Sequence, residues 1–108
     1  MVASSETHTF VKATLASHGV TVFSKTYCPY CTQAKSVLAS VGAPYHVIEL
    51  DVVPNGDEIL QALIELTGRR TVPNVFVKDV TIGGGSDVAQ LQRDGKLVPL
   101  LQTAGVLV

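Results

Sequence analysis

Cys28 and Cys31 are the only two cysteines among the 108 residues, and Pro29 and Tyr30 separate them. An apolar run at residues 20–23 precedes the pair, and a helical pattern follows it. Residues three apart share one face of a helix, so the two sulfurs can meet in a small, reducible ring. In this setting of apolar run, turn and helix, a lone Cys-x-x-Cys indicates a redox-active dithiol.

Pro29 predicts where the helix begins. Proline lacks an N–H and has a φ suited to a helix, so it is favoured at the first helical position. This places Cys28 at or beside the N-cap, where unpaired N–H groups and the positive end of the helix dipole favour an anion. Lys25 adds a cation nearby. We therefore predict that Cys28 is the exposed attacking thiolate, and that Cys31, one turn into the helix, is the shielded resolving thiol.

Two other uses of the cysteine pair fit the chain less well. A structural disulfide that closes so short a loop would stabilise a fold little. A zinc site needs about four ligands, and His8, His18 and His46 show no paired ligand spacing. A metal shared between two chains stays open as an alternative. We expect redox chemistry and no metal site within the chain.

Composition narrows the class of protein. The 108 residues are 46% hydrophobic, which suits one domain over residues 1–108 with a single packed core. The formal net charge of -1 provides no electrostatic footprint for nucleic acid or for an acidic membrane surface. No apolar run approaches the roughly 20 residues that span a bilayer. We expect a soluble monomer without nucleic-acid or membrane partners.

Cysteine usage and the N-terminus favour a reducing compartment. Both cysteines belong to one motif, which leaves none for the disulfide framework of a secreted domain. Residues 1–6 lack the basic region and the apolar stretch of a signal peptide. A cytoplasmic location is therefore expected, or an organelle if a targeting segment has been removed.

The rest of the chain predicts alternating helices and strands. Strands are expected where residues are β-branched or aromatic, and helices where apolar residues recur at helical spacing. The expected order is helix 5–18 with a stop at Gly19, strand 20–24, helix 29–41, strand 45–50, helix 57–66, strands 75–77 and 80–82, and a helix from 86 or 87 to 93. A last apolar segment, 97–101, should cover the sheet. This order predicts an α/β fold, with helices on both faces of a small mixed sheet.

Three motifs make the chain similar to a known family. They are TYCPYC at residues 26–31, RTVP at 70–73 and GGGSD at 83–87. In their order and separations they resemble the dithiol glutaredoxins, and the resemblance covers roughly residues 8–104. It implies a thioredoxin-like fold with a four-stranded mixed sheet. It also implies a glutathione-dependent thiol–disulfide oxidoreductase that acts on protein disulfides and on glutathione mixed disulfides.

The resemblance implies an unusual backbone at Val72 and Pro73. In the family the matching Val-Pro bond is cis and faces the cysteine pair. From the residues alone we would expect a trans bond, because only about 5–6% of X-Pro bonds in folded proteins are cis. A cis bond would turn the Val72 N–H and C=O toward the active site, where an extended thiol peptide could pair with them like an added strand.

The family's glutathione site also carries over to residues of this chain. The matching residues are Lys25, Cys28, Tyr30, Thr71, Val72, Pro73, Ser86 and Asp87. N–H groups at the helix start near Ser86 suit a carboxylate, Asp87 can pair with an ammonium, and the γ-glutamyl end of glutathione offers both groups. The glycine carboxylate needs a cation, for which Lys25 and Arg70 are the candidates. Tyr30 could pack its ring on the tripeptide, or it is simply an exposed aromatic at a turn.

Two positions depart from the family pattern. Many dithiol members carry a Gln before the Arg-Thr-Val-Pro motif, where this chain has Leu60 followed by Gln61. A polar contact to the glycine carboxylate is therefore expected to be missing or shifted. Gly85 stands where many relatives have a bulkier residue, and we expect it to loosen that loop. Neither position touches the redox pair.

The resemblance makes glutathione a cosubstrate, with no tightly bound cofactor, and its oxidised form is returned to glutathione by NADPH and glutathione reductase. Two other functions are alternatives to this one. A thioredoxin reduced directly by a flavoenzyme usually carries Trp before the first cysteine, and this chain has no Trp. An iron–sulfur carrier built from two chains and two glutathiones is the second alternative, although Pro29 keeps Cys31 placed to compete for Cys28.

Lys25→Glu should weaken the use of glutathione mixed disulfides while leaving the fold intact. Lys25 lies three residues before Cys28, where its charge favours both the thiolate and the glycine carboxylate. A solvated charge contact is worth on the order of 1 kcal/mol, so a loss of several-fold is expected. Steady-state kinetics and a thiol titration measure it, and unchanged values in both would remove Lys25 from the site.

Overall fold

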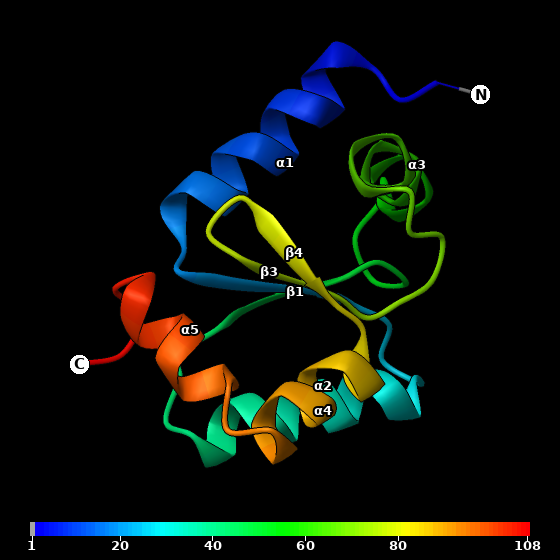
Figure 1. Ribbon diagram of the computed structural model, residues 1–108. Helices are drawn as coiled ribbons and strands as arrows, with labels where there is room; N and C mark the ends of the chain where they lie inside the picture. The colour runs from blue at the N-terminus through cyan, green and yellow to red at the C-terminus, as the bar shows by residue number, and fades with distance from the viewer. Residues whose placement is uncertain (1) are drawn as a thin grey trace.

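The computed structural model describes residues 2–108 and folds them into a four-stranded sheet with helices on both faces (Figure 1). The strands are β1 (Val20–Ser24), β2 (His46–Glu49), β3 (Asn74–Val77) and β4 (Val80–Gly83). They lie in the order β2-β1-β3-β4, with β1 parallel to β2 and antiparallel to β3, and with β3 antiparallel to β4. The predicted α/β fold with a mixed sheet is confirmed.

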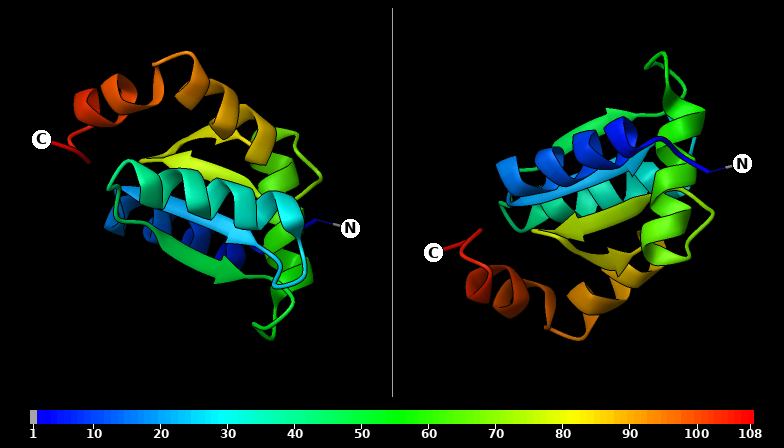
Figure 2. Two further views of the ribbon diagram at one scale, coloured as in Figure 1. Left: turned by 90° about the horizontal axis from the view of Figure 1, so that it is seen from below. Right: turned by 90° about the horizontal axis from the view of Figure 1, so that it is seen from above.

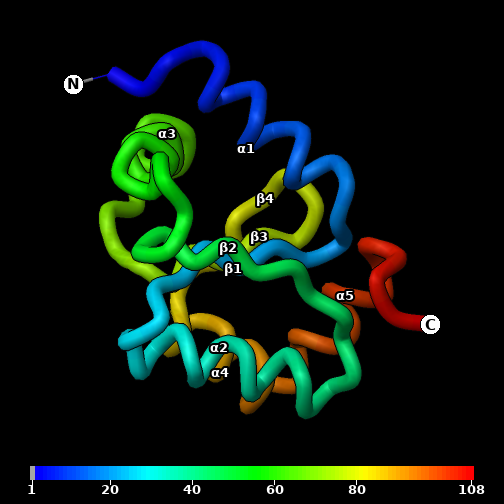
Figure 3. The backbone as a smooth tube through the Cα atoms, turned by 180° about the vertical axis from the view of Figure 1, so that it is seen from behind, coloured from blue at the N-terminus to red at the C-terminus, as the bar shows by residue number. Residues whose placement is uncertain are grey.

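The helices form one layer on each face of the sheet. They are α1 (Ser5–Ser17), α2 (Pro29–Ser40), α3 (Gly56–Thr67), α4 (Gly85–Arg93) and α5 (Leu97–Thr103). Figures 1 and 2 show α1 and α3 on one face and α2 and α4 on the other, and the view from behind in Figure 3 shows the same layers. Because both faces are covered, all of β1 is buried, which explains its largely apolar run. None of the helices within residues 2–108 combines the length and apolarity needed to cross a membrane.

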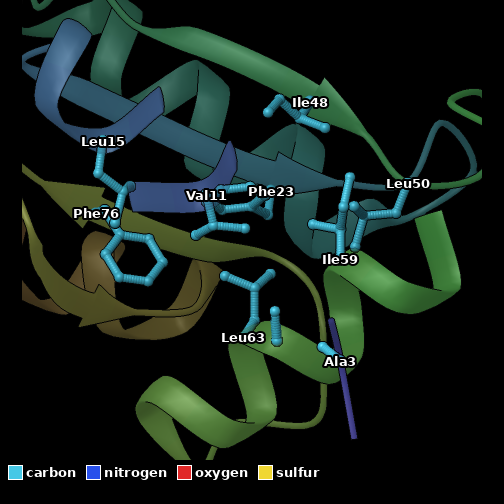
Figure 4. Packing of buried hydrophobic residues seen from close by; sticks show 10 residues of the cluster. Ala3, Val11, Leu15, Phe23, Ile48, Leu50, Ile59, Leu63 and Phe76 are labelled. Carbon is cyan, nitrogen blue, oxygen red and sulfur yellow. The ribbon is translucent and has the colours of Figure 1, made fainter. Parts of the chain in front are cut away.

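Two clusters of buried side chains join the helices to the sheet. The first lies under α1 and α3 and contains Phe23 and Phe76 (Figure 4). These rings meet edge to face, with centroids 5.6 Å apart and planes at 80°, an arrangement that the ring quadrupoles favour. The second cluster lies on the side of α2 and α4 and includes Leu97 and Leu101 of α5. The expectation that this last apolar segment covers the sheet is therefore confirmed.

Element boundaries differ from the predicted ones by one or two residues. The strand predicted over residues 45–50 is shorter at both ends, and the helix predicted from Asp57 begins at Gly56. The first helix ends because His18 has an extended backbone, with φ −132° and ψ 142°. The helix thus ends one residue before the predicted end at residue 18, and Gly19 directly follows its C-cap.

The turn of the β3–β4 hairpin forms without glycine. Lys78 and Asp79 connect the strands, and Lys78 takes a φ of 55°. Two-residue hairpin turns require positive φ, which Asn and Gly usually supply. The predicted hairpin is confirmed, with a lysine in the backbone conformation that these residues normally take.

The fold brings four segments of the chain to one end of the sheet. These are the loop after β1, the first turn of α2, the segment that leads into β3, and the first turn of α4, all on the right of Figure 1. α2 packs along α4 on the same face of the sheet, so their first turns are neighbours. The three sequence motifs fall on these segments.

Phe76→Ala should lower the free energy of unfolding by about 3–5 kcal/mol, because it removes a buried aromatic ring and leaves a cavity. The Phe76 side chain is 2% exposed. Phe10→Ala is the matched control, since Phe10 is 46% exposed on α1 and should cost below about 1 kcal/mol. Denaturant unfolding followed by circular dichroism measures both, and equal losses would contradict the central place of Phe76 in the core.

Candidate active site

Cys28 is the N-cap residue of α2. Its backbone is extended, with φ −94° and ψ 115°, and Pro29 takes the first helical position as predicted. The Cys31 N–H donates a hydrogen bond to the Cys28 sulfur, with an N···S distance of 3.2 Å. The sulfur thus satisfies one of the N–H groups that a helix start leaves without partners, and a charged acceptor strengthens such a bond. Both cysteines are free thiols.

Cys31 lies one turn into α2 and is fully buried, whereas Cys28 is partly exposed. Burial raises the pKa of the Cys31 thiol, and its hydrogen bond with Cys28 raises this pKa further. Cys31 is therefore held as a protonated thiol that a large disulfide cannot reach from solvent. Cys28 is the sulfur that a substrate can approach.

The peptide bond between Val72 and Pro73 is cis. The Val72 carbonyl oxygen lies 3.7 Å from the Cys28 sulfur, so this backbone segment faces the cysteine pair. The cis bond implied by the resemblance is confirmed, and the trans bond expected from the residues alone is wrong. Val72 packs against the first core cluster and Pro73 is buried, which fixes this main chain beside the sulfur.

The first turns of α2 and α4 are in close contact. α4 begins at Gly85, one residue before the earliest predicted start. Gly85 is buried, and a methyl group on its Cα would clash with the carbonyl oxygen of Tyr30. The expected loosening of this loop is therefore wrong, because the missing side chain permits tight packing instead. Tyr30 is 61% exposed beside this junction.

The other predicted binding residues lie on the segments gathered at this end of the sheet. The Lys25 carbonyl accepts the N–H of the N-cap cysteine at 3.2 Å. Arg70 and Thr71 are exposed in the segment before the cis bond, and Ser86 and Asp87 are exposed at the start of α4. The structure thus brings both halves of the predicted glutathione site to one end of the molecule.

Arg69, which no sequence motif marks, is the arginine that contacts α4. Its Nη1 lies 3.6 Å from Asp87 Oδ2, and the same carboxylate oxygen accepts the Gly84 N–H at 2.8 Å. Two adjacent arginines carry no sign of which one faces the helix, because that depends on the path of the backbone. Of the two arginines, only Arg70 is assigned a role from the sequence, as a candidate partner of the glycine carboxylate together with Lys25.

Asp51 is a second residue that sequence reasoning missed. Its carboxylate accepts hydrogen bonds from the Thr26 hydroxyl and from the Thr26 N–H, the latter at 3.0 Å to Oδ1. These bonds, led by that of the hydroxyl, lower the pKa of Asp51. They hold the loop that carries Lys25 into the N-cap. A signal was present, because Asp51 follows β2, and the parallel strands β1 and β2 end at the same edge of the sheet.

The departure at positions 60 and 61 has a structural counterpart. Leu60 packs against the first core cluster, and Gln61 donates a hydrogen bond to Glu65 Oε2 at 2.9 Å within α3. The amide of Gln61 is therefore engaged along its own helix. That the family's polar contact is missing or shifted stays a prediction.

The histidines take part in other contacts. His18 and His46 stack with ring centroids 3.9 Å apart, and His8 contacts Glu65 at 2.6 Å. Within residues 2–108, no three His, Cys, Asp or Glu side chains are grouped so as to hold a metal ion.

Comparison with known proteins agrees with this geometry. The glutaredoxin family model matches residues 20–82. The chain belongs to the glutaredoxin family. It is 50% identical to a glutaredoxin of Ricinus communis over 99 aligned residues, and this alignment covers 92% of this chain and 97% of the relative. It is 49% identical over 96 residues to glutaredoxin-C2 of Arabidopsis thaliana, which covers 89% and 86%.

A solved structure of a glutaredoxin has the same fold. The buckwheat glutaredoxin–glutathione complex superposes with a TM-score of 0.88 at 42% identity, covering 97% of this chain and 99% of that one. The thioredoxin-like fold is therefore that of the glutaredoxins. Glutaredoxins are glutathione-dependent thiol–disulfide oxidoreductases, and this chain is an enzyme of that class.

Asp51→Asn should lower the melting temperature of this glutaredoxin at pH 7, because it weakens the acceptor that holds Thr26. A carboxylate with a lowered pKa stabilises the fold above its ordinary pKa of 3.8, and the effect is lost as the pH falls through the lower, folded value. The gap between wild type and variant should therefore be full at neutral pH and close in acid. Melting curves from neutral to acid pH measure it.

Asp79→Asn, in the exposed hairpin turn, is the control for the loss of one negative charge. Hydrogen bonds, led by that of the Ala3 N–H, lower the pKa of Glu65 to about 2. Glu65 contributes to the pH dependence of stability in both proteins, so its contribution cancels in their difference. A gap that stayed constant down to acid pH would show that the Asp51 charge does not anchor the loop.

Proposed function

We propose that this glutaredoxin reduces glutathione mixed disulfides and protein disulfides with Cys28 as nucleophile and Cys31 as resolving thiol. The observation that carries the proposal is the hydrogen bond from the Cys31 N–H to the Cys28 sulfur at the start of α2. It supports an anion on the accessible sulfur, while the second sulfur is buried directly behind it. Attack by a thiolate on a disulfide sulfur is the general route of such exchange.

With a glutathione mixed disulfide, Cys28 alone completes the reaction. The Cys28 thiolate attacks the glutathione sulfur, the disulfide bond breaks, and the substrate thiolate leaves and takes a proton from water. A glutathione thiolate then attacks the glutathione sulfur bound to Cys28. Oxidised glutathione leaves, and the Cys28 thiolate is restored. One mixed disulfide and one glutathione give one protein thiol and one oxidised glutathione.

With a protein disulfide, Cys31 takes the second step. Cys28 attacks one sulfur, and the mixed disulfide with the protein is resolved when Cys31 loses its proton and attacks the Cys28 sulfur. The position of Cys31 one turn into α2 places its sulfur on the same helix face as that of Cys28. Two glutathiones then reduce the Cys28–Cys31 disulfide and leave as oxidised glutathione.

The glutathione that enters these steps would lie across the four segments that the fold brings to one end of the sheet. The glutathione complex of the buckwheat relative supports this assignment. The extended tripeptide pairs with the Val72 main chain as an added strand would, and Pro73 fixes that main chain. The glycine carboxylate of the tripeptide faces Lys25, Arg70 and Thr71, and the Tyr30 ring packs on the tripeptide. The γ-glutamyl end of the tripeptide lies at Ser86 and Asp87. Glutathione reductase, with NADPH, regenerates glutathione in a separate reaction. The protein partners are glutathionylated and disulfide-containing proteins, and this chain acts on them as a monomer.

Cys28→Ser should abolish both activities, because it removes the attacking sulfur. Cys31→Ser should keep the removal of glutathione from mixed disulfides, since external glutathione can still resolve Cys28. It should lose most reduction of protein disulfides, for which an intramolecular thiol is needed. The measurements are glutathione-coupled rates on a small glutathione mixed disulfide and on a disulfide-bonded protein.

The two variants serve as controls for each other, because both replace one sulfur by oxygen in the same turn of α2. A Cys31→Ser protein inactive toward the small glutathione mixed disulfide would make the assignment of roles wrong. Measurable activity of the Cys28→Ser protein on either substrate would also make the assignment wrong. Thermal melting of both variants separates loss of chemistry from loss of fold.

A further inference from the structure

The Arg69 guanidinium lies over the start of α4. Its Nη1 is 3.6 Å from Asp87 Oδ2. Its Nη2 is 2.6 Å from the position that a Cβ would take on Gly84, the buried N-cap residue of α4. Any side chain at Gly84 would collide with the guanidinium, so the glycine leaves the space that Arg69 occupies. Arg69 therefore reaches across from the segment before β3 to the helix start.

Opposite charges are thus displayed side by side at this end of α4. The Asp87 side chain is 55% exposed and that of Arg69 is 31% exposed, so a ligand can reach both. Asp87 is held in place by the Gly84 N–H at 2.8 Å. The first N–H groups of α4 have no partners within the helix, and they favour an anion together with the guanidinium.

The ion pair itself does not explain why Arg69 is placed here. At 3.6 Å the pair is too long for a hydrogen bond, and partly exposed pairs of this kind contribute little to stability. Arg69 Nε is buried and makes no hydrogen bond to any of residues 2–108. A buried donor without a partner opposes folding. These contacts alone do not account for the placement of the Arg69 guanidinium at the start of α4.

We propose that Arg69 is a specificity-determining residue for the γ-glutamyl end of the thiol substrate. Arg69 and the start of α4 bind the free α-carboxylate, while Asp87 binds the α-ammonium of the same residue. The proposal rests on the proposed function and adds to it the residue that recognises the zwitterion. A γ-linked glutamyl group carries both charges on one carbon, whereas a residue inside an ordinary peptide chain carries neither.

The two charges of the zwitterion match the two charges of the protein. Asp87 alone would attract any ammonium and repel a carboxylate. With Arg69 beside Asp87, the pair attracts a group that carries both an ammonium and a carboxylate. An ammonium alone binds less well, because the Arg69 guanidinium repels it. The long, partly exposed Arg69–Asp87 pair can open for a ligand at small cost. Arg69 thereby favours γ-glutamyl thiols over simple amine thiols.

Three mixed disulfides with one reporter peptide test this assignment. The first carries glutathione, the second carries glutathione with its γ-glutamyl α-carboxylate converted to a carboxamide, and the third carries glutathione without its α-amino group. The kcat/KM for each mixed disulfide reports the first half-reaction. It is measured for wild type, Arg69→Gln, Arg69→Lys and Arg93→Gln, with a melting curve for each protein.

Wild type should lose about threefold to tenfold on the carboxamide substrate. Arg69→Gln should lose a similar factor on the glutathione substrate and show a much smaller further loss on the carboxamide. It should keep its preference for the α-amino group, because Asp87 remains. Arg69→Lys keeps the charge without the planar fork and should fall between them. Arg93→Gln, the matched control at the far end of α4, should behave as wild type.

Arg69→Gln rates that fell equally on all three substrates would overturn the proposal, because that pattern indicates a structural support. An unchanged carboxamide penalty in Arg69→Gln would overturn it as well. A wild type that cleaved all three substrates alike would keep the reductase function and remove the zwitterion subsite. A wild type that failed on the glutathione substrate itself would overturn both proposals, so the two failures are distinguishable.

Discussion

The hydrogen bond from the Cys31 N–H to the Cys28 sulfur joins the folding of this glutaredoxin to its chemistry. The sulfur caps the start of α2 as a side-chain oxygen does in other helices, so the group that caps the helix is also the proposed nucleophile. The surrounding structure supports this atom. Pro29 begins the helix, Asp51 holds Thr26 in the preceding loop, and the Val72 carbonyl lies 3.7 Å away.

Features that depend on local chemistry could be predicted from the sequence. The place of Cys28 follows from Pro29, because a proline after a strand can open a helix but cannot continue one. The four strands follow from short β-branched runs, and the burial of β1 on both faces explains why that run is nearly continuous. The hairpin was predictable from its strands, although Lys78 takes a backbone conformation that its own type does not favour.

Features that depend on the approach of distant segments could not be predicted in this way. Gly85 suggested a loose loop, yet it permits contact with the Tyr30 carbonyl, more than fifty residues away. The choice between Arg69 and Arg70 depends on how the chain turns before β3. The cis bond at Val72 follows from no local preference and was expected only through the family resemblance. Asp51 lies between these cases, because strand order would have placed it beside the loop.

The close packing at Gly85 has a consequence for the size of the substrate. Because the first turn of α4 rests on the backbone of the first turn of α2, the separation between the reactive sulfur and the start of α4 is fixed by main-chain contact. In the proposed binding mode, this fixed separation would select a thiol substrate by its length as well as by its charge. If the substrate binds as proposed, we expect a thiol whose amino-acid head group stands one methylene nearer to its sulfur, as in a β-aspartyl analogue, to reach only one of the two ends without strain.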